Sequence, residues 1–201
     1  MTRWFIFDIG NTVIRIAYER VLENICLAAD SDRDQLVEIF ELPGGYRDME
    51  RGAADLSAFY EHLADKAGYR GTESDLETIW MDFFDGPVFG IEEVLARVRA
   101  EHRVAFLSNL GRFHAELIPR RFAPLFHTED RFLFAHTFQL AKPDPEVFRR
   151  TLGAIGARAE DTVVVDDLLE NVLAARGEGM TAFQFRDTTT LIRELETAKL
   201  I

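Results

Sequence analysis

Three short apolar runs, each followed at once by polar residues, constrain the fold of this 201-residue chain more than any other feature. They cover residues 3–9, 103–107 and 162–165, and a fourth strand is predicted over residues 181–185. Helical patterns lie between or after these runs, at residues 91–100, 145–152, 170–176 and 188–198. Apolar strands that alternate with helices are typical of a parallel sheet covered on both faces. The sequence therefore predicts an α/β core.

The segment 15–87 has a different pattern, with apolar residues at helical spacing and no strand-like run. Four helices are predicted, around Val21–Leu27, Leu36–Phe40, Leu56–Leu63 and Leu76–Phe83. The run Leu42-Pro43-Gly44-Gly45-Tyr46 interrupts them. We expect an all-helical second domain at 15–87, inserted after the first strand of a core made of residues 1–14 and 88–201.

Charge and composition narrow the expected partners. The chain has 35 acidic and 23 basic residues, a net charge of −12, and no cluster of basic residues, which argues against nucleic acid or an anionic membrane. Its apolar runs are far shorter than the roughly 18 residues of a membrane span. The single cysteine, Cys26, fits a reducing compartment. We expect a cytoplasmic protein that acts on a small molecule as a monomer or homodimer.

Polar residues from four separate parts of the chain are predicted to meet at one edge of the sheet. Asp8, Ser108 and Asp166 follow predicted strands, and ligands of open α/β sheets bind beyond the carboxyl ends of strands. Lys142 precedes the helix start at Pro143-Asp144-Pro145. The carboxylates of Asp8, Asp166 and Asp167 would repel one another unless a cation joined them, and Mg²⁺ prefers such oxygen ligands. Each residue alone could be a helix cap or part of a turn; the combination favours a site.

This arrangement resembles the haloacid dehalogenase superfamily, whose four motifs occur here in order. They are Phe7-Asp8-Ile9-Gly10-Asn11-Thr12, Phe106-Leu107-Ser108-Asn109, Lys142-Pro143-Asp144-Pro145-Glu146-Val147-Phe148, and Val165-Asp166-Asp167 with Asn171. The resemblance implies a Rossmann-like, three-layer α/β core and a small helical cap that closes over the active site. It also implies a phosphatase-like hydrolase that acts on a small phosphate ester, with sugar phosphates as one candidate class.

The resemblance also implies roles for individual residues. Asp8 would be the nucleophile that forms an aspartyl-phosphate, and Mg²⁺ would be bound by Asp8, Asp166 and the backbone carbonyl of Gly10. Two catalytic residues, Ser108 and Lys142, would hold the phosphoryl oxygens.

Further motif residues have supporting roles. Asn109 would bind the substrate. Asp167 would act on the metal through water or orient Lys142, and Asn171 would support the loop of the fourth motif.

Gly10 departs from the family pattern. Most phosphatases of the family carry a second aspartate there, as general acid and base, which contributes about 10²- to 10⁴-fold in rate. Two interpretations remain open: a phosphatase that uses good leaving groups or another proton donor, and a catalytically weakened protein that binds phosphate. The Asp-x-Gly-Asn form resembles a branch with sugar-phosphate phosphatases, which favours activity. Without a replacement acid, kcat/KM should depend steeply on leaving-group pKa.

Two other functions share parts of the pattern. Metal-independent 2-haloacid dehalogenases also lack the second aspartate, but they do not need the pair Asp166-Asp167. Receiver domains of signalling proteins use similar residues in the reverse order and have no helical insertion. Within the cap, Tyr46, Arg47 and Arg51 are candidates for recognising the leaving group, with a solvated turn as the alternative interpretation.

Overall fold

The core of the molecule is a parallel sheet, described by a computed structural model that covers residues 2–201. Its strands lie in the order β5-β4-β1-β6-β7, and every neighbouring pair is parallel. The bounds are Trp4–Phe7 (β1), Arg103–Ser108 (β4), Arg131–Phe134 (β5), Thr162–Asp166 (β6) and Thr181–Gln184 (β7). The predicted α/β core is confirmed, with β5 as an unpredicted edge strand. Because β1 lies at the centre, the end of β1 meets the ends of β4 and β6.

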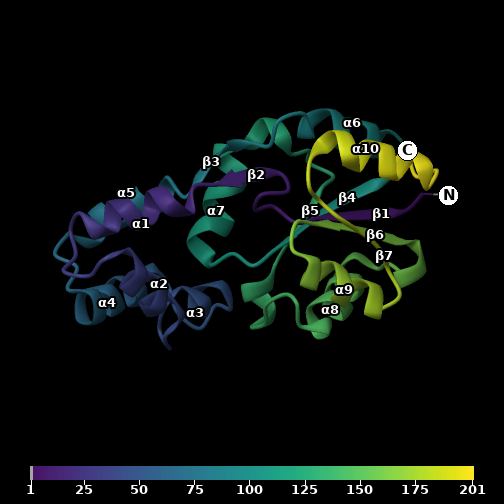
Figure 1. Ribbon diagram of the computed structural model, residues 1–201. Helices are drawn as coiled ribbons and strands as arrows, with labels where there is room; N and C mark the ends of the chain where they lie inside the picture. The colour runs from purple at the N-terminus through teal and green to yellow at the C-terminus, as the bar shows by residue number, and fades with distance from the viewer. Residues whose placement is uncertain (1) are drawn as a thin grey trace.

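Helices cover both faces of this sheet, which makes three layers (Figure 1). One face carries α6 (Ile91–Glu101) and α10 (Thr188–Thr197), and the other carries α8 (Pro145–Ile155) and α9 (Leu169–Gly177). The alternation of side chains along β1 explains the two faces: Phe5 and Phe7 pack with the first pair of helices, and Ile6 packs with the second. The remaining core helices are α7 (Arg112–Arg121) and the 3-10 turns Ala123–Leu125, Ala135–Phe138 and Ala159–Asp161.

The insertion forms a helical cap beside the sheet (Figure 1). Its helices are α1 (Tyr18–Cys26), α2 (Arg33–Glu41), α3 (Tyr46–Glu50), α4 (Leu56–Ala67) and α5 (Glu73–Met81). An antiparallel ribbon of β2 (Ile14–Ile16) and β3 (Phe84–Pro87) joins it to the core. The expectation of an insertion without strands was therefore wrong at its two ends, where the runs are too short to show an alternating pattern. The expected break is found at residues 42–45, and a short helix that was not predicted, α3, follows it directly.

Local signals in the sequence start the cap helices. Asp32 and Gln35 form a capping box at the start of α2, and Thr72 and Asp75 form one at the start of α5. Asp55 accepts a hydrogen bond from the first turn of α4. These caps satisfy backbone N–H groups that have no partner within their helix.

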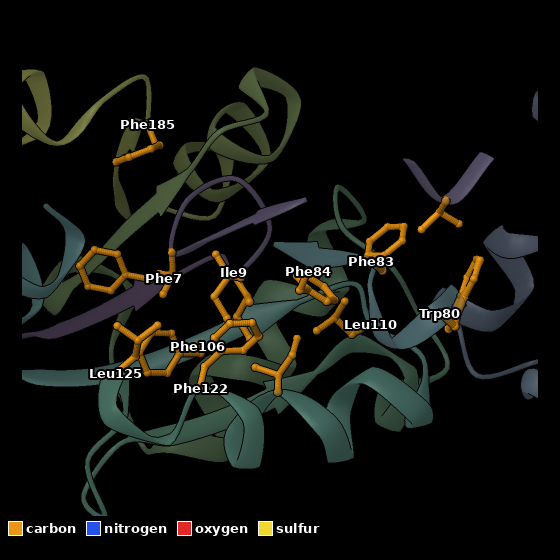
Figure 2. Close-up of a cluster of buried hydrophobic side chains, with 14 of the residues drawn as sticks. Phe7, Ile9, Trp80, Phe83, Phe84, Phe106, Leu110, Phe122, Leu125 and Phe185 are labelled. Carbon is orange, nitrogen blue, oxygen red and sulfur yellow. The ribbon is translucent and has the colours of Figure 1, made fainter. Parts of the chain in front are cut away.

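The apolar core continues from the sheet into the cap. Figure 2 shows side chains of this cluster, which runs from Phe7 and Phe106 on the sheet to Phe84, Phe83 and Trp80 at the base of the cap. Most of these rings are fully buried. Each Å² of buried apolar surface contributes roughly 25 cal/mol of stability. The shared cluster therefore stabilises the core, the cap and the junction between them. Within residues 2–201, no helix is both long enough and apolar enough to cross a membrane.

Candidate active site

A buried lysine joins two carboxylates at the carboxyl edge of the sheet. Lys142 Nζ lies 2.6 Å from Asp8 Oδ1 and 2.6 Å from Asp166 Oδ2, and it donates to the Leu107 carbonyl at 3.1 Å. Asp8 follows β1, Asp166 ends β6, and Leu107 lies in β4. All three ionisable side chains are buried. The fold thus brings together the predicted nucleophile, the predicted lysine and one predicted metal ligand.

Asn109 holds the main chain of Lys142 from both sides. Its Oδ1 accepts a hydrogen bond from the Lys142 N–H at 2.8 Å, and its Nδ2 donates to the Lys142 carbonyl at 2.9 Å. The amide was expected to bind substrate directly. These two bonds make Asn109 a positioning residue for the lysine. Asn109 also lines the cavity, so its contact with substrate stays a prediction.

The fourth motif is fixed through Asp166. Asp166 Oδ1 accepts hydrogen bonds from the Leu168 N–H at 3.0 Å and from Asn171 Nδ2 at 2.8 Å, while Oδ2 faces Lys142. Asn171 therefore supports this loop. Asp167 lines the site cavity without a hydrogen bond to Lys142 among the described residues.

The electrostatics of the site reflect an excess of acids. Burial raises the pKa of Asp8 to about 7, with Lys142 opposing the rise and Asp166 adding to it. Burial acts to lower the pKa of Lys142, but the charges of Asp166 and Asp8 raise it above its usual value, so the lysine stays charged. Burial and Asp166 also raise the pKa of Asp167. One lysine thus faces three carboxyl groups.

This donor set fits a hard divalent cation. Described residues 2–201 contain no group of three or more His, Cys, Asp or Glu side chains that could hold a metal. The expected magnesium site does not need such a group, because it uses two carboxylates, Asp8 and Asp166, and the Gly10 carbonyl. Mg²⁺ commonly binds through one or two carboxylates and keeps several waters. A cation there would balance the excess of negative charge.

A cavity of about 180 Å³ lies between this edge and helix α3 of the cap. Its core side includes Asp8, Ser108, Lys142 and Asp167. Drug-sized ligands occupy pockets of roughly 300–1,000 Å³, so this cavity accommodates only a small ligand.

The cap side of the cavity carries two of the three predicted recognition residues. Tyr46 and Arg47 line it, whereas Arg51 is exposed and is not among the lining residues. The Arg47 guanidinium lies between Glu41, at 2.9 Å, and Glu50, at 3.3 Å. Glu50 also lines the cavity, and sequence reasoning gave it no role. The available signal was its i,i+3 spacing from Arg47.

His114, the only histidine close to a motif, lies elsewhere. It is buried on α7, and its ring stacks on Trp80 and Phe83, with centroids 5.7 and 5.1 Å away. Its Nε2 is 2.8 Å from the Trp80 carbonyl. It therefore belongs to the junction between cap and core, and it does not line the cavity.

Residues 2–179 match the family model described as haloacid dehalogenase-like hydrolase. The chain belongs to this family of hydrolases. Its curated relatives include the sesquiterpene phosphatase astK of Aspergillus oryzae, which is 38% identical over 64 residues, 31% of this chain and 33% of that protein. Two other curated relatives are much longer proteins. Their match to this chain extends over 57 residues, which is 10% of their length.

Solved structures share the fold of this hydrolase over nearly its whole length. A HAD family enzyme of Bacteroides thetaiotaomicron, solved with magnesium and inorganic phosphate, is 19% identical with a TM-score of 0.80, covering 94% of this chain and 96% of that one. An L-2-haloacid dehalogenase of Xanthobacter autotrophicus is 18% identical with a TM-score of 0.66, covering 100% and 85%. Phosphate-binding and dehalogenating enzymes thus both have this fold.

Proposed function

We propose that this hydrolase is a Mg²⁺-dependent phosphatase that acts on a small phosphate ester through an aspartyl-phosphate on Asp8. The observation that carries the proposal is the buried Lys142, within 2.6 Å of both Asp8 and Asp166, at the wall of a small cavity. The magnesium and phosphate bound to the B. thetaiotaomicron enzyme and the phosphatase activity named for the A. oryzae relative support it.

The residues of the chain divide the reaction between them. An Asp8 carboxylate oxygen attacks phosphorus, and the bond from phosphorus to the leaving oxygen breaks. Lys142, and the Ser108 hydroxyl on the same cavity wall, hold the phosphoryl oxygens. Water then attacks the phosphorus of the intermediate and frees Asp8. Mg²⁺, bound by Asp8, Asp166 and the Gly10 carbonyl, would supply positive charge to the transferring group.

A 2-haloacid dehalogenase is the second candidate, because those enzymes also lack a carboxyl group at the position of Gly10. They need no metal, however, and would leave the charges of Asp166 and Asp167 without a role. The excess of carboxyl groups over lysine therefore favours phosphoryl transfer.

Phosphate release from sugar, nucleotide and aryl phosphates, with Mg²⁺ or EDTA, tests the proposal. Wild type should release phosphate with Mg²⁺, EDTA should abolish release, and Asp8→Asn should lower kcat by about 10³-fold or more. Asp187→Asn is the matched control, since it makes the same change at the cap of α10, where asparagine also serves.

Activity that survives both EDTA and Asp8→Asn would contradict the mechanism. Binding of phosphate without turnover of any ester would select the catalytically weakened protein, and metal-independent chloride release from 2-haloacids would select the dehalogenase.

A further inference from the structure

The position of the family's second aspartate lies against an apolar side chain. A Cβ atom added to Gly10 would lie 2.6 Å from Ile16 Cδ1. Ile16 ends β2, at the base of the cap. A side chain at this position would require the Ile16 methyl group to move. Gly10 itself carries no acid, so a proton donor for the leaving group would come from another element.

Glu50 is the buried carboxyl group on the opposite wall of the cavity. It lies on α3, and its side chain is only 11% exposed. Glu170 also lines the cavity, but it is exposed on α9. The remaining lining carboxyls, Asp8 and Asp167, belong to the nucleophile and to the paired acidic motif. Glu50 thus lines, from the cap, the same cavity that Asp8 and Lys142 line from the core.

The cap is fixed against the core on both sides of Glu50. A Cβ atom on Gly111 would lie 2.9 Å from the Met49 carbonyl oxygen, and one on Gly52 would lie 2.9 Å from the His136 carbonyl oxygen. Such close approaches leave no room for a side chain on either glycine. Figure 1 shows α3 at the end of the cap that is nearest to the core. The backbone on either side of Glu50 is therefore packed closely against the core.

We propose that Glu50 is the general acid and base of the reaction, in place of the carboxyl group missing at Gly10. This inference rests on the proposed phosphatase function. When Asp8 attacks phosphorus, the bond to the leaving oxygen breaks, and that oxygen keeps the electron pair and takes the proton of Glu50. The Glu50 carboxylate then accepts a proton from the water that attacks the intermediate. The bond from phosphorus to Asp8 breaks, which releases phosphate and restores both carboxyl groups.

The surroundings of Glu50 suit a carboxyl group that carries a proton. Burial raises its pKa, although Arg47 and a hydrogen bond from Tyr46 oppose the rise. Arg47 is shared with Glu41, so its charge is divided between two carboxylates. The titratable and charged groups around Glu50 are Tyr46, Arg47 and Glu41 from the cap, and Asp8, Lys142 and Asp167 across the cavity.

Leaving-group dependence of kcat/KM in Glu50→Gln tests the assignment. Alkyl phosphates need a proton on the leaving oxygen, whereas p-nitrophenyl phosphate does not. We expect Glu50→Gln to lower kcat/KM about 10²- to 10⁴-fold for alkyl esters and to leave the aryl ester within a few-fold of wild type. Turnover of the aryl ester shows at the same time that the variant is folded. Glu41→Gln is the control, because it removes the other partner of Arg47 outside the cavity.

The pH profile provides a second readout. A general acid works only while protonated, so wild-type kcat/KM for an alkyl ester should fall as pH rises through the pKa of Glu50. Glu50→Gln should lose that limb, and Glu41→Gln should keep it.

Three results would overturn the inference. Equal losses on alkyl and aryl esters, or no loss on either, would remove Glu50 from proton transfer while Asp8→Asn inactivity still upheld the phosphatase. A loss as large in Glu41→Gln would assign the effect to the placement of Arg47. Absence of any phosphatase activity in wild type would overturn both the proposed function and the inference.

Discussion

Lys142 has an environment that few lysines have, with its ammonium group buried between two carboxylates and its main chain held by one amide. Removing a charged partner from such a group strands buried charges, which typically costs 3–5 kcal/mol. A substitution that loosens the lysine but keeps all three charges is less disruptive. Asn109 is suitable for it, because its side chain bonds only the main chain of Lys142.

We expect Asn109→Ala to destabilise the protein by about 1–3 kcal/mol, since the Lys142 N–H and carbonyl lose their partners. It should also lower kcat, because the ammonium group is no longer held beside Asp8. Urea denaturation and phosphate release measure the two effects. Asn24→Ala, the same change on cap helix α1, serves as the control. Wild-type kcat in Asn109→Ala would contradict the positioning role.

His114 provides a residue-scale test of stability. Burial lowers its pKa from 6.5 to about 4. The unfolded chain therefore binds the proton more tightly than the native protein. Above pH 6.5 the histidine is neutral in both states and does not lower the free energy of unfolding. As the pH falls towards 4, protonation of the unfolded chain lowers the free energy of unfolding by about 3 kcal/mol.

We expect His114→Phe, which keeps a ring between Trp80 and Phe83, to reduce this pH dependence. Between pH 7 and pH 4 the free energy of unfolding, measured in urea, should fall by up to about 3 kcal/mol more in wild type than in the variant. Parallel curves would mean that the histidine is not buried as a neutral group.

At the scale of elements, the contact of α3 with the core depends on glycine. Gly111 has an ordinary backbone conformation, with φ of −66°, so the strain on alanine there comes from its contact with Met49, above all with the carbonyl oxygen. We expect Gly111→Ala to push α3 outward, to destabilise the protein by about 1–3 kcal/mol and to lower kcat/KM. Thermal unfolding and phosphate release measure both.

Gly153→Ala is the matched control for Gly111→Ala. Gly153 lies in α8 with nothing within 4 Å of an added Cβ, so alanine there should stabilise the helix by up to about 1 kcal/mol. Equal effects of the two substitutions would contradict a close contact between α3 and the core.

Elements with strong local signals could be predicted from the sequence, and elements that depend on tertiary packing could not. The apolar runs of β1, β4 and β6 and the capped helices α2 and α5 carry their own patterns. The edge strand β5 runs directly into the 3-10 turn Ala135–Phe138 without polar residues at its end, and α7 contains Pro119, which helices usually exclude. The helix α3 has only five residues and follows Pro43 and two glycines, so the sequence predicts a turn there.

The residues of the candidate site also differ in whether the sequence alone could predict them. Asp8, Ser108, Lys142 and Asp166 could be predicted because each follows or precedes a recognisable element. Glu50 could not be predicted, because its burial and its place in the cavity arise only when the cap packs on the core.

At the scale of the whole molecule, cap and sheet share one apolar cluster, from Phe7 to Trp80 (Figure 2). The cap is thus packed through its base, and its far helices lie away from the active site (Figure 1). The chain has a net charge of −12, and some of its carboxyl groups line the cavity, where they suit a cation. A bound cation would let an acidic protein act on an anionic ester, as the proposed function requires.

The proposed function depends above all on the phosphorylation of Asp8 during turnover. Wild type and Asp8→Asn, mixed with a radiolabelled phosphate ester and Mg²⁺ and quenched in acid within one turnover, test it directly. We predict label in the wild-type peptide that contains Asp8, released by hydroxylamine, and none in Asp8→Asn. Full-rate release of phosphate with no label on that peptide, or turnover by Asp8→Asn, would contradict the account.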